Sequence, residues 1–592
     1  MRDVIIIGAG GGGPVVAKEL AARGLDVLMI EAGPRHAKPR DEWAHLENNA
    51  NNPVSGYFRF GPEDRSKPAW LRETPQNSFI WQVSGVGGTT QHYYGNNPRA
   101  IPGVFRGYNG RDKDAYDREH EFPFSYRSMI PYYEWVEATL PVQTAAMGHK
   151  ERTFLRGAEK MGLPLQRSKD TSRPAYRPQE NAILQPGGTA GRTEDPNKMR
   201  YPQAKGCTYC GFCFQGCYEP QGAPRNLAAK RSTDNSYVPM ALTADAWHRG
   251  GKRATLITDA FVTKIVSAQE GADTVAKGVT WRENATGAEH TEEAKVVVLS
   301  AGCTEGPRLW FNSDLPNPND WVGRGYTDHH FDWVIGQMPF YTGSSKGPGS
   351  SARVDVPGHG GLENVGLPPA LQAFSATFSD AGMAGHYDNG VDITPAGSDA
   401  IGRRVGGDLR DLLAHGVDRL LNVLVITDDD VEARNRVTLS SSIPPDSNGP
   451  APKVEFHQRN RSGRTKANRE LMATMAAQLL RAAGAEKVYR IGWAPLILHV
   501  QSTMRMGADP SNSVLDASAE ARFVKRLFVA DNSALSNCLG GPNPTLTSQA
   551  LATRTAENIF QRYFGGDRWV RTESPVVSTD RRVTRALRSV GL

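Results

Sequence analysis

Four of the six cysteines in this 592-residue chain are crowded into one short segment. Cys207, Cys210, Cys213 and Cys217 have the spacing C-x2-C-x2-C-x3-C, which is typical of ferredoxin loops that bind cubane iron–sulfur clusters. The same C-x2-C spacing suits a tetrahedral zinc site. The thiols could also be free of metal or form local disulfides. The pattern predicts a metal-binding loop, with an iron–sulfur centre as the first interpretation.

A glycine-rich turn near the N-terminus has the spacing of a dinucleotide-binding site. Residues 4–7 are a β-branched run typical of a buried parallel strand, and residues 14–23 have helical spacing. Between them, Gly8, Gly10 and Gly13 form G-x-G-x-x-G, which lets backbone N–H groups approach a pyrophosphate. Glu31 ends the second predicted strand, where a carboxylate accepts hydrogen bonds from ribose hydroxyls. These residues alone do not separate FAD from NAD.

The composition restricts the classes of function. Hydrophobic residues make up 39% and charged residues 22%, with 61 Gly and 39 Pro, which favours a large, loop-rich α/β enzyme. The net charge of +6 is dispersed along the chain, so no nucleic-acid partner is expected. No apolar run approaches the roughly 20 residues of a membrane span. The strand pattern begins at once without a leader, which predicts a cytoplasmic protein, with export on a partner subunit as the alternative.

Further segments, in chain order, resemble the glucose-methanol-choline (GMC) oxidoreductases, flavoproteins that oxidise alcohols. The resemblance is most specific near the C-terminus, in HVQSTMRMG at 499–507 and FVADNSALSNCLGGPNPTLTSQALATRTAENI at 528–559. The other matching segments are GVGGTTQH at 85–92, FPFSYRSMIPYYEWVE at 122–137, SAGCTEGPRL at 300–309, VGRGYTDHH at 322–330 and NRVTL at 435–439.

The resemblance implies an α/β fold of two interleaved domains. One is a Rossmann-type FAD-binding domain of parallel sheet and helices, assembled from 1–40, 80–100, 200–320 and 500–565. The other is a substrate-binding domain with an antiparallel sheet, from 101–199 and 321–499. Residues 41–79 would be a lid or insertion and 566–592 a C-terminal tail. Two stretches rich in Pro, Gly and Ser, 341–361 and 440–452, are expected to be surface loops.

Two side chains match the catalytic positions of the family. His499 matches the first, and a neutral imidazole is well suited to take the hydroxyl proton of an alcohol. Asn543 matches the second, where an amide can orient the substrate oxygen but cannot titrate. Ser502 stands where the family often has Gly. The resemblance also places these residues at the cofactor: Gly87, Gly88, Thr89, His92, Asp531, Asn543, Pro544 and Thr545.

His92 has a second interpretation. The segment VGGTTQHYY resembles the loop in which pyranose 2-oxidases attach FAD covalently through a histidine. The alternatives are a noncovalent contact with the flavin and simple packing.

The resemblance also extends to the cysteine segment. Iron–sulfur-containing large subunits of bacterial sugar and gluconate dehydrogenases use C-x5-C-x3-C here, which Cys207, Cys213 and Cys217 reproduce; Cys210 could complete a four-iron cluster in place of a three-iron one. The predicted function is oxidation of a CH–OH group of a sugar, polyol or glycoside, with electrons passing through the cluster to an acceptor protein or quinone and a small subunit as partner. The alternatives are an oxygen-using oxidase of sugars, sterols or long-chain alcohols with a structural cysteine loop, and a noncatalytic flavin-bound or metal-stabilised scaffold.

Overall fold

A mixed seven-stranded sheet surrounds the N-terminal strand in this computed structural model. Its strands are β1 (Arg2–Ile7), β2 (Val27–Ile30), β10 (Thr255–Ile257), β11 (Ala260–Glu270), β12 (Asp273–Glu283), β13 (Glu289–Leu299) and β23 (Leu527–Val529). The order is β10-β2-β1-β13-β12-β11, and β23 also pairs with β13. Strands β10, β2, β1, β13 and β23 pair in parallel, whereas β11 and β12 extend the sheet as an antiparallel pair.

The strand register brings four turns to one edge of this sheet. Ile7 pairs with both Ile30 and Leu299, and Leu299 pairs with Val529. The carboxyl ends of parallel strands therefore end at the same level, where ligands bind in doubly wound sheets. The residues that follow these strands at that edge are Gly8, Glu31, Ser300 and Ala530.

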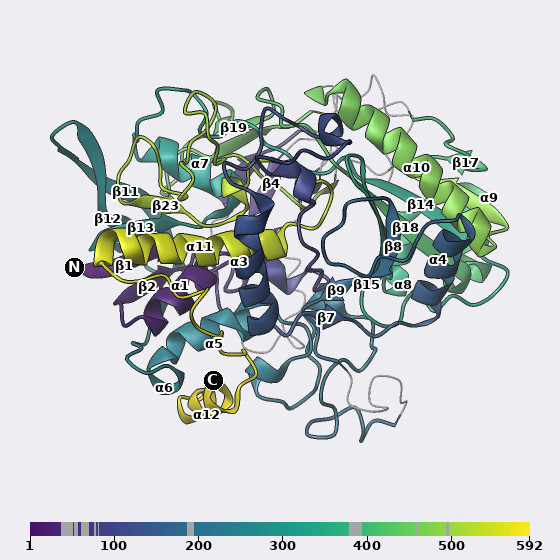
Figure 1. Cartoon of the computed structure of the whole chain (residues 1–592), viewed down its shortest axis with the longest axis horizontal. Coiled ribbons are helices and arrows are strands. Elements are labelled where there is room, and N and C mark those ends of the chain that lie inside the picture. The colour runs from purple at the N-terminus through teal and green to yellow at the C-terminus, as the bar shows by residue number, and fades with distance from the viewer. Residues whose placement is uncertain are drawn as a thin grey trace.

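A second seven-stranded sheet is mainly antiparallel, with the order β17-β21-β14-β18-β16-β15-β8. Its strands are β8 (Ala175–Pro178), β14 (Asp332–Gln337), β15 (Ser350–Val356), β16 (Gly360–Val365), β17 (Ala400–Ile401), β18 (Leu420–Thr427) and β21 (Lys487–Arg490). Helices α4 (His149–Lys160) and α10 (Gly463–Ala483) pack against it over a cluster that includes Val354, Leu362 and Leu480. Figure 1 shows the first sheet on the left and the second on the right.

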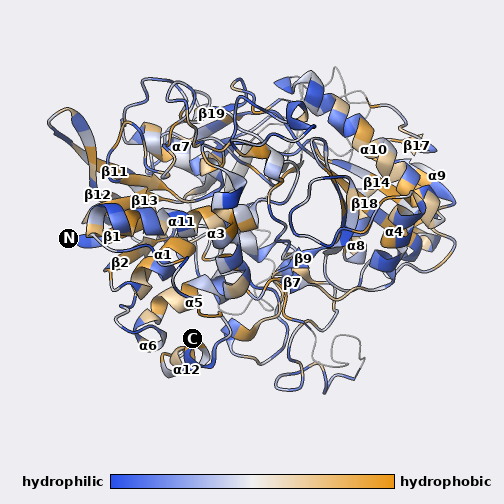
Figure 2. Cartoon of the chain, in the orientation of Figure 1, coloured by the Kyte–Doolittle hydropathy of each residue, from blue (hydrophilic) through white to orange (hydrophobic). Residues whose placement is uncertain are grey.

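The remaining helices lie around both sheets. Helix α1 (Gly13–Ala22) contacts α11 (Thr545–Phe564), which also contacts α3 (Tyr126–Thr139). In Figure 2 the strands around β1 and β13 are orange, whereas α10 carries both colours, as expected of a helix with one buried face. The other helices are α5 (Tyr237–Leu242), α6 (Ala244–Trp247), α7 (Gly302–Asn312), α8 (Pro369–Ser375), α9 (Gly406–His415) and α12 (Arg581–Ser589).

Three small sheet elements complete the fold. Their strands are β3 (Asn51–Asn52), β4 (Tyr57–Phe60), β5 (Trp70–Glu73), β19 (Arg436–Leu439) and β20 (Pro452–Glu455) in one sheet, with the pairs β6 (Phe79–Ile80)–β22 (Leu496–Ile497) and β7 (Gln143–Thr144)–β9 (Glu180–Asn181). The structure describes residues 1–36, 51–52, 57–60, 70–75, 79–80, 82–185, 195–377, 393–457, 460–492 and 496–592. None of the helices in these ranges has the length and apolar character needed to cross a lipid bilayer.

The mixed α/β fold confirms the predicted fold class, and one local expectation was wrong. The stretch 341–361 is not only a surface loop, because it contains the fully buried strand β15. In the tail, 566–592, helix α12 buries Val583 and Leu587 and contacts α5 and α6. Most of the predicted insertion at 41–79 lies outside the described residues. The division of the chain into two domains at the stated boundaries stays a prediction.

Candidate functional site

One cavity joins the carboxyl edge of the first sheet to the second sheet. Its volume is about 310 Å³, which is within the usual range for small-molecule sites. Of the residues singled out in the sequence, it is lined by Gly8, Gly10, Glu31, Gly88, Thr89, His92, His499, Asp531, Asn543, Pro544 and Thr545. The cavity thus brings together segments from the N-terminal and C-terminal parts of the chain. Gly13, Gly87 and the four clustered cysteines do not line it.

The glycines of the turn fall into two groups, those that permit close backbone packing and one that leaves open space. A Cβ on Gly12 would lie 1.9 Å from the Ala530 carbonyl oxygen, and one on Gly13 would lie 2.2 Å from the Gly8 carbonyl oxygen, so these two glycines permit close backbone packing. A Cβ on Gly10 would meet no atom closer than 4.0 Å. Helix α1 has no side-chain cap and no acidic residue in its first turn. Its first N–H groups are therefore suited to a pyrophosphate.

Glu31 ties the end of β2 to the glycine turn. Its Oε2 accepts a hydrogen bond from the Ala9 N–H at 2.8 Å, and its Oε1 accepts one from the Gly33 N–H at 2.9 Å. Burial raises the pKa of Glu31, while these two backbone bonds oppose that shift. The carboxylate lines the cavity, but its demonstrated contacts are with the chain itself. The ribose contact stays a prediction.

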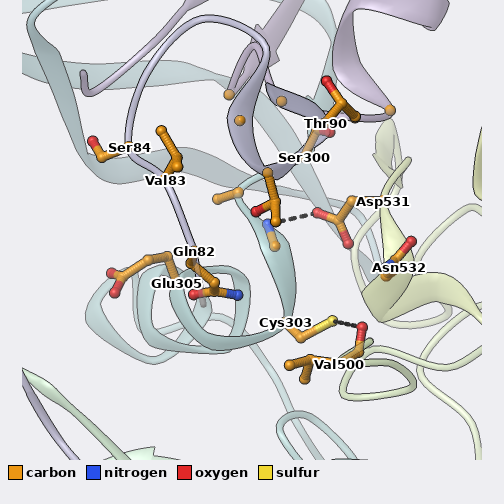
Figure 3. Close-up of a pocket in the computed structure, with 18 of the residues that line it drawn as sticks. Gln82, Val83, Ser84, Thr90, Ser300, Cys303, Glu305, Val500, Asp531 and Asn532 are labelled. Atoms are coloured by element: carbon orange, nitrogen blue, oxygen red, sulfur yellow. Dashed lines mark hydrogen bonds between the residues drawn. The ribbon is translucent and has the colours of Figure 1, made fainter. Parts of the chain in front are cut away.

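Asp531 connects β23 to the start of α7. Its Oδ2 accepts from the Gly302 N–H at 2.8 Å and its Oδ1 accepts from the Ser533 N–H at 2.7 Å. Figure 3 shows this carboxylate directed toward the turn after Ser300, with Cys303 donating from Sγ to the Val500 carbonyl at 3.1 Å. Asp531 therefore accepts hydrogen bonds from backbone N–H groups of the turns around it, as carboxylates at strand ends often do. It also borders the cavity.

The loop containing His92 lies directly on the glycine turn. Gly87 has φ +99°, and a Cβ on Gly88 would lie 2.9 Å from the Gly10 Cα. His92 Nδ1 lies 3.0 Å from the Phe214 carbonyl oxygen. A carbonyl can only accept, so Nδ1 carries the proton and Nε2 is the basic nitrogen of the neutral ring. Phe214 lies between Cys213 and Cys217, so this contact joins the His92 loop to the cysteine segment. Phe214 also lines the cavity.

His499 lies where the cavity reaches the second sheet. Its backbone N–H donates to Asp328 Oδ1 at 2.9 Å, and the Leu498 N–H donates to Asp328 Oδ2 at 3.0 Å. The imidazole meets the ring of His329 edge-on, with centroids 5.0 Å apart. Burial lowers the pKa of His499 well below 6.5, and the neighbouring His329 and Arg353 lower it further. The ring is therefore neutral, as a proton acceptor must be.

Asp328 is a positioning residue that the sequence did not reveal. It belongs to the DHH segment, yet its role depends on a contact with residues 170 positions away. An isolated bridge between Thr327 and Gln501 brings the two segments together. Burial raises the pKa of Asp328 to about 7, and Arg461 opposes the shift.

The wall opposite the glycine turn is polar. Asn543 Oδ1 accepts a hydrogen bond from Arg353 Nη1 at 3.2 Å, and the same nitrogen donates to Glu363 Oε1 at 3.0 Å. Asn96 Nδ2 donates to Glu363 Oε2 at 3.1 Å. Glu363, Asn96 and Asn543 line the cavity beside Leu424. Of these three residues only Asn543 was predicted from the sequence. The alternation of Arg353, Val354 and Asp355 within 341–361 was the available signal of a strand.

A second polar cluster borders the cavity near α7. Arg72 Nε donates to Glu305 Oε1 at 2.9 Å, and Arg72 also donates to Gln82. Arg308 lies over the Phe261 ring with its guanidinium carbon 5.0 Å from the centroid. These residues come from β5, the loop after β6, α7 and β11, so no short motif could have predicted the cluster.

The cysteine segment is packed as part of the protein interior. Cys207, Cys213 and Cys217 share a small buried cluster with Ile183 and Ala229, and all six cysteines of the chain are free thiols. The described residues, which include these cysteines, contain no group of three or more Cys, His, Asp and Glu side chains that could hold a metal ion. The predicted iron–sulfur cluster and its zinc alternative therefore gain no support from the structure.

A buried lysine joins the cysteine segment to the His92 loop. Lys230 Nζ donates to the carbonyl oxygens of Gln91 at 2.6 Å, Tyr93 at 2.8 Å and Cys213 at 2.6 Å. An ammonium with three such acceptors is satisfied despite complete burial. The segment thereby supports the part of the cavity wall that Phe214 and His92 provide.

Comparisons with known proteins agree with this geometry. Two family models described as GMC oxidoreductase match residues 170–331 and 431–552. The chain is 26% identical to the 2-methyl-1,2-propanediol dehydrogenase of Mycolicibacterium austroafricanum over 95% of both chains. It is 24% identical to the fructose dehydrogenase large subunit of Gluconobacter japonicus, covering 94% of this chain and 97% of that one. A solved pyridoxine 4-oxidase from Mesorbium loti has the same fold, with TM-score 0.55 and 14% identity over 96% of this chain and 100% of that one.

The fold and the two family models define the class of the protein as an oxidoreductase. The chain belongs to the GMC oxidoreductase family.

Proposed function

We propose that this protein is an FAD-dependent oxidoreductase that oxidises a CH–OH group of a polyol, sugar or glycoside. The observation that carries the proposal is the single cavity shared by the glycine turn, the His92 loop, His499 and Asn543. Relatives named for a diol and for fructose support this class of substrate.

The described residues fit FAD at both ends of the cavity. The open Cβ direction of Gly10 and the uncapped N-terminus of α1 suit the pyrophosphate. Helix α11 also begins without a side-chain cap, at Pro544 and Thr545, which line the cavity. Its N-terminal dipole would stabilise negative charge on the isoalloxazine. When bound, FAD supplies the hydride acceptor.

His499 and Asn543 would divide the chemistry of the alcohol between them. His499 takes the hydroxyl proton, since its low pKa keeps the ring neutral. Asn543 holds the substrate oxygen through a hydrogen bond that strengthens as negative charge develops there. Asp328 holds the backbone of residues 498 and 499 and so sets the height of the imidazole in the cavity.

The proposal is tested with purified protein under anaerobic conditions. A visible spectrum should show bound flavin, and titration with diols, sugars, glycosides, sterols and aliphatic alcohols should bleach it. Bleaching by polyhydroxylated substrates at lower concentrations than by monohydric alcohols supports the proposed class. Folded protein that neither contains nor takes up FAD would refute the proposal. Acid precipitation of the same sample shows whether His92 is bonded to the flavin, because a covalent flavin stays in the pellet.

The pH dependence of flavin reduction should distinguish His499 from Asp328. A base whose pKa is depressed stays unprotonated as the pH falls, so we expect no loss of rate through pH 6.5 that is assignable to His499. An inflection near pH 7 is expected from Asp328, and Asp328→Asn should remove it. Stopped-flow reduction rates between about pH 5.5 and 8.5 provide the measurement. An inflection near 6.5 that persists in Asp328→Asn would contradict a neutral His499.

For the electrons that leave FAD, we propose direct transfer to an acceptor that approaches the flavin cavity. The support is that the described cysteines do not form a group able to hold a metal ion, while their segment contributes Phe214 to the cavity wall. The predicted relay to a protein or quinone through iron is tested by iron and acid-labile sulfide analysis. We expect no stoichiometric iron, and Cys213→Ser should affect flavin content and dye reduction together. Several irons per chain, with dye reduction lost but flavin reduction kept in Cys213→Ser, would restore the relay.

A further inference from the structure

The Asn543 amide lies between two buried charged side chains of opposite sign. Arg353 is on β15 and Glu363 is on β16, where the two residues form a cross-strand pair. Their exposed fractions are 0% and 1%, and that of Asn543 is 7%. Arg353 Nη1 donates to both Asn543 Oδ1, at 3.2 Å, and Glu363 Oε1, at 3.0 Å. Burial raises the pKa of Glu363, while the neighbouring Arg353 and Asn543 oppose that shift.

Arg353 and Glu363 determine which way the Asn543 amide is turned. A guanidinium can only donate and a carboxylate can only accept. The Asn543 oxygen must therefore face Arg353, and its NH₂ group must face Glu363. One N–H of that group faces the carboxylate, and the second N–H is left for the cavity that Asn543 lines.

The backbone at Gly541, in the loop before Asn543, packs closely against the backbone at Gly360. A Cβ on Gly541 would lie 2.8 Å from the Gly360 Cα, so the loop before Asn543 rests directly on the first residue of β16. Gly541 has φ +105° and Gly360 has φ +138°, which side chains rarely adopt. The contact fixes the distance between the C-terminal loop and the Arg353–Glu363 pair.

We propose that Arg353 and Glu363 are positioning residues that orient Asn543 so that it donates an N–H to the substrate oxygen. This inference rests on the proposed function. The donor would stabilise the charge that develops on the oxygen as His499 removes its proton, so the effect belongs to the transition state more than to substrate binding. A side chain that could rotate its amide would present the carbonyl oxygen half of the time and repel the same charge.

A double-mutant cycle tests the inference. Arg353→Lys keeps the charge but loses the planar fork, and we expect the limiting rate of flavin reduction to fall roughly tenfold with the substrate dissociation constant nearly unchanged. In Asn543→Ala, adding Arg353→Lys should cause little further loss, because the positioned group is already gone. Additive effects of the two changes would overturn the positioning role.

Arg490→Lys is the matched control. Arg490 is a fully buried arginine on β21 of the same sheet, paired with Asp332 and Glu470 and outside the cavity lining. It should leave the limiting rate within about twofold, and a tenfold loss there would show that any buried lysine in this sheet disturbs catalysis. If Arg353→Lys fails to fold, Glu363→Gln replaces it in the cycle, with the same two outcomes.

A readout independent of turnover accompanies the cycle. The dissociation constant of the carbonyl product for the oxidised enzyme, measured from the perturbed flavin band, should change less than the limiting rate in Arg353→Lys. An equal loss in both would overturn the inference, since it would mean a general collapse of the site. A wild-type enzyme that no alcohol reduces would refute the proposed function instead, so the two failures are separable.

Discussion

Replacing His499 with alanine should slow reduction of the bound flavin by about 100-fold or more, the usual contribution of a general base. The imidazole lines the cavity, and burial holds its pKa well below 6.5, so the wild-type ring is neutral and can accept a proton near neutral pH. Without it, the proton must go to water, hydroxide or buffer. The residual rate in His499→Ala should therefore rise with pH, whereas the wild-type rate should not depend on His499 titration. Anaerobic stopped-flow absorbance at the flavin band measures both.

The matched control for this prediction is His359→Ala. His359 is half-buried near the start of β16, where its Nδ1 lies 2.8 Å from Asn468 Oδ1, and it does not line the cavity. Its loss should leave the reduction rate within about twofold. Both variants should retain flavin, because neither residue belongs to the glycine turn or the His92 loop. Unchanged bleaching in His499→Ala would remove this residue from the mechanism and leave Asn543 without a partner base.

Strand β1, the glycine turn and helix α1 were predictable from the sequence because the patterns that indicate them are local. A buried parallel strand, a tight glycine turn and a helix follow one another within residues 2–22, and each has its own pattern. What the turn does not reveal is which glycine serves packing and which leaves room for a ligand. That distinction depends on Ala530, which is more than 500 residues away in the chain.

The polar wall of the cavity escaped prediction for a physical reason. Arg353 and Asp355 alternate with Val354 and Val356, a pattern that normally marks a solvent-exposed strand face. Here these charged side chains are buried and paired, Arg353 with Asp355 on the same strand and with Glu363 across to β16. The surrounding Gly, Pro and Ser residues added turn signals that hid the strand. Pairing between distant segments is what the sequence pattern lacks.

The cysteine segment shows that a strong local pattern does not by itself establish a metal site. Its spacing is a strong local signal, yet spacing alone does not set the directions of the sulfur atoms. In the structure the segment is held by Lys230 and by the contact of His92 with the Phe214 carbonyl. A pattern that suits cluster ligands therefore coexists with a supporting role in the flavin cavity.

Gly12→Ala should cause a large loss of stability through a backbone clash in the glycine turn. The backbone angles of Gly12, φ −109° and ψ −42°, are allowed for alanine, so strain in φ is not the cause. The added Cβ would lie 1.9 Å from the Ala530 oxygen and 2.8 Å from its carbonyl carbon, and backbone atoms cannot rotate away. Either α1 or the turn after β23 must move. We expect the free energy of unfolding of the apo-protein to fall by roughly 3 kcal/mol and FAD to be lost.

Gly10→Ala separates this packing effect from ligand binding in the same turn. The nearest atom to its new Cβ would be the Gly88 Cα at 4.0 Å, so the apo-protein should unfold within about 1 kcal/mol of the wild type. The methyl group would instead occupy space that the cavity offers to a pyrophosphate, and FAD affinity should fall. Thermal unfolding of apo-protein and flavin titration measure the two effects separately. Equal destabilisation in both variants would show that the turn is rigid throughout, and normal FAD affinity in Gly10→Ala would place the pyrophosphate elsewhere.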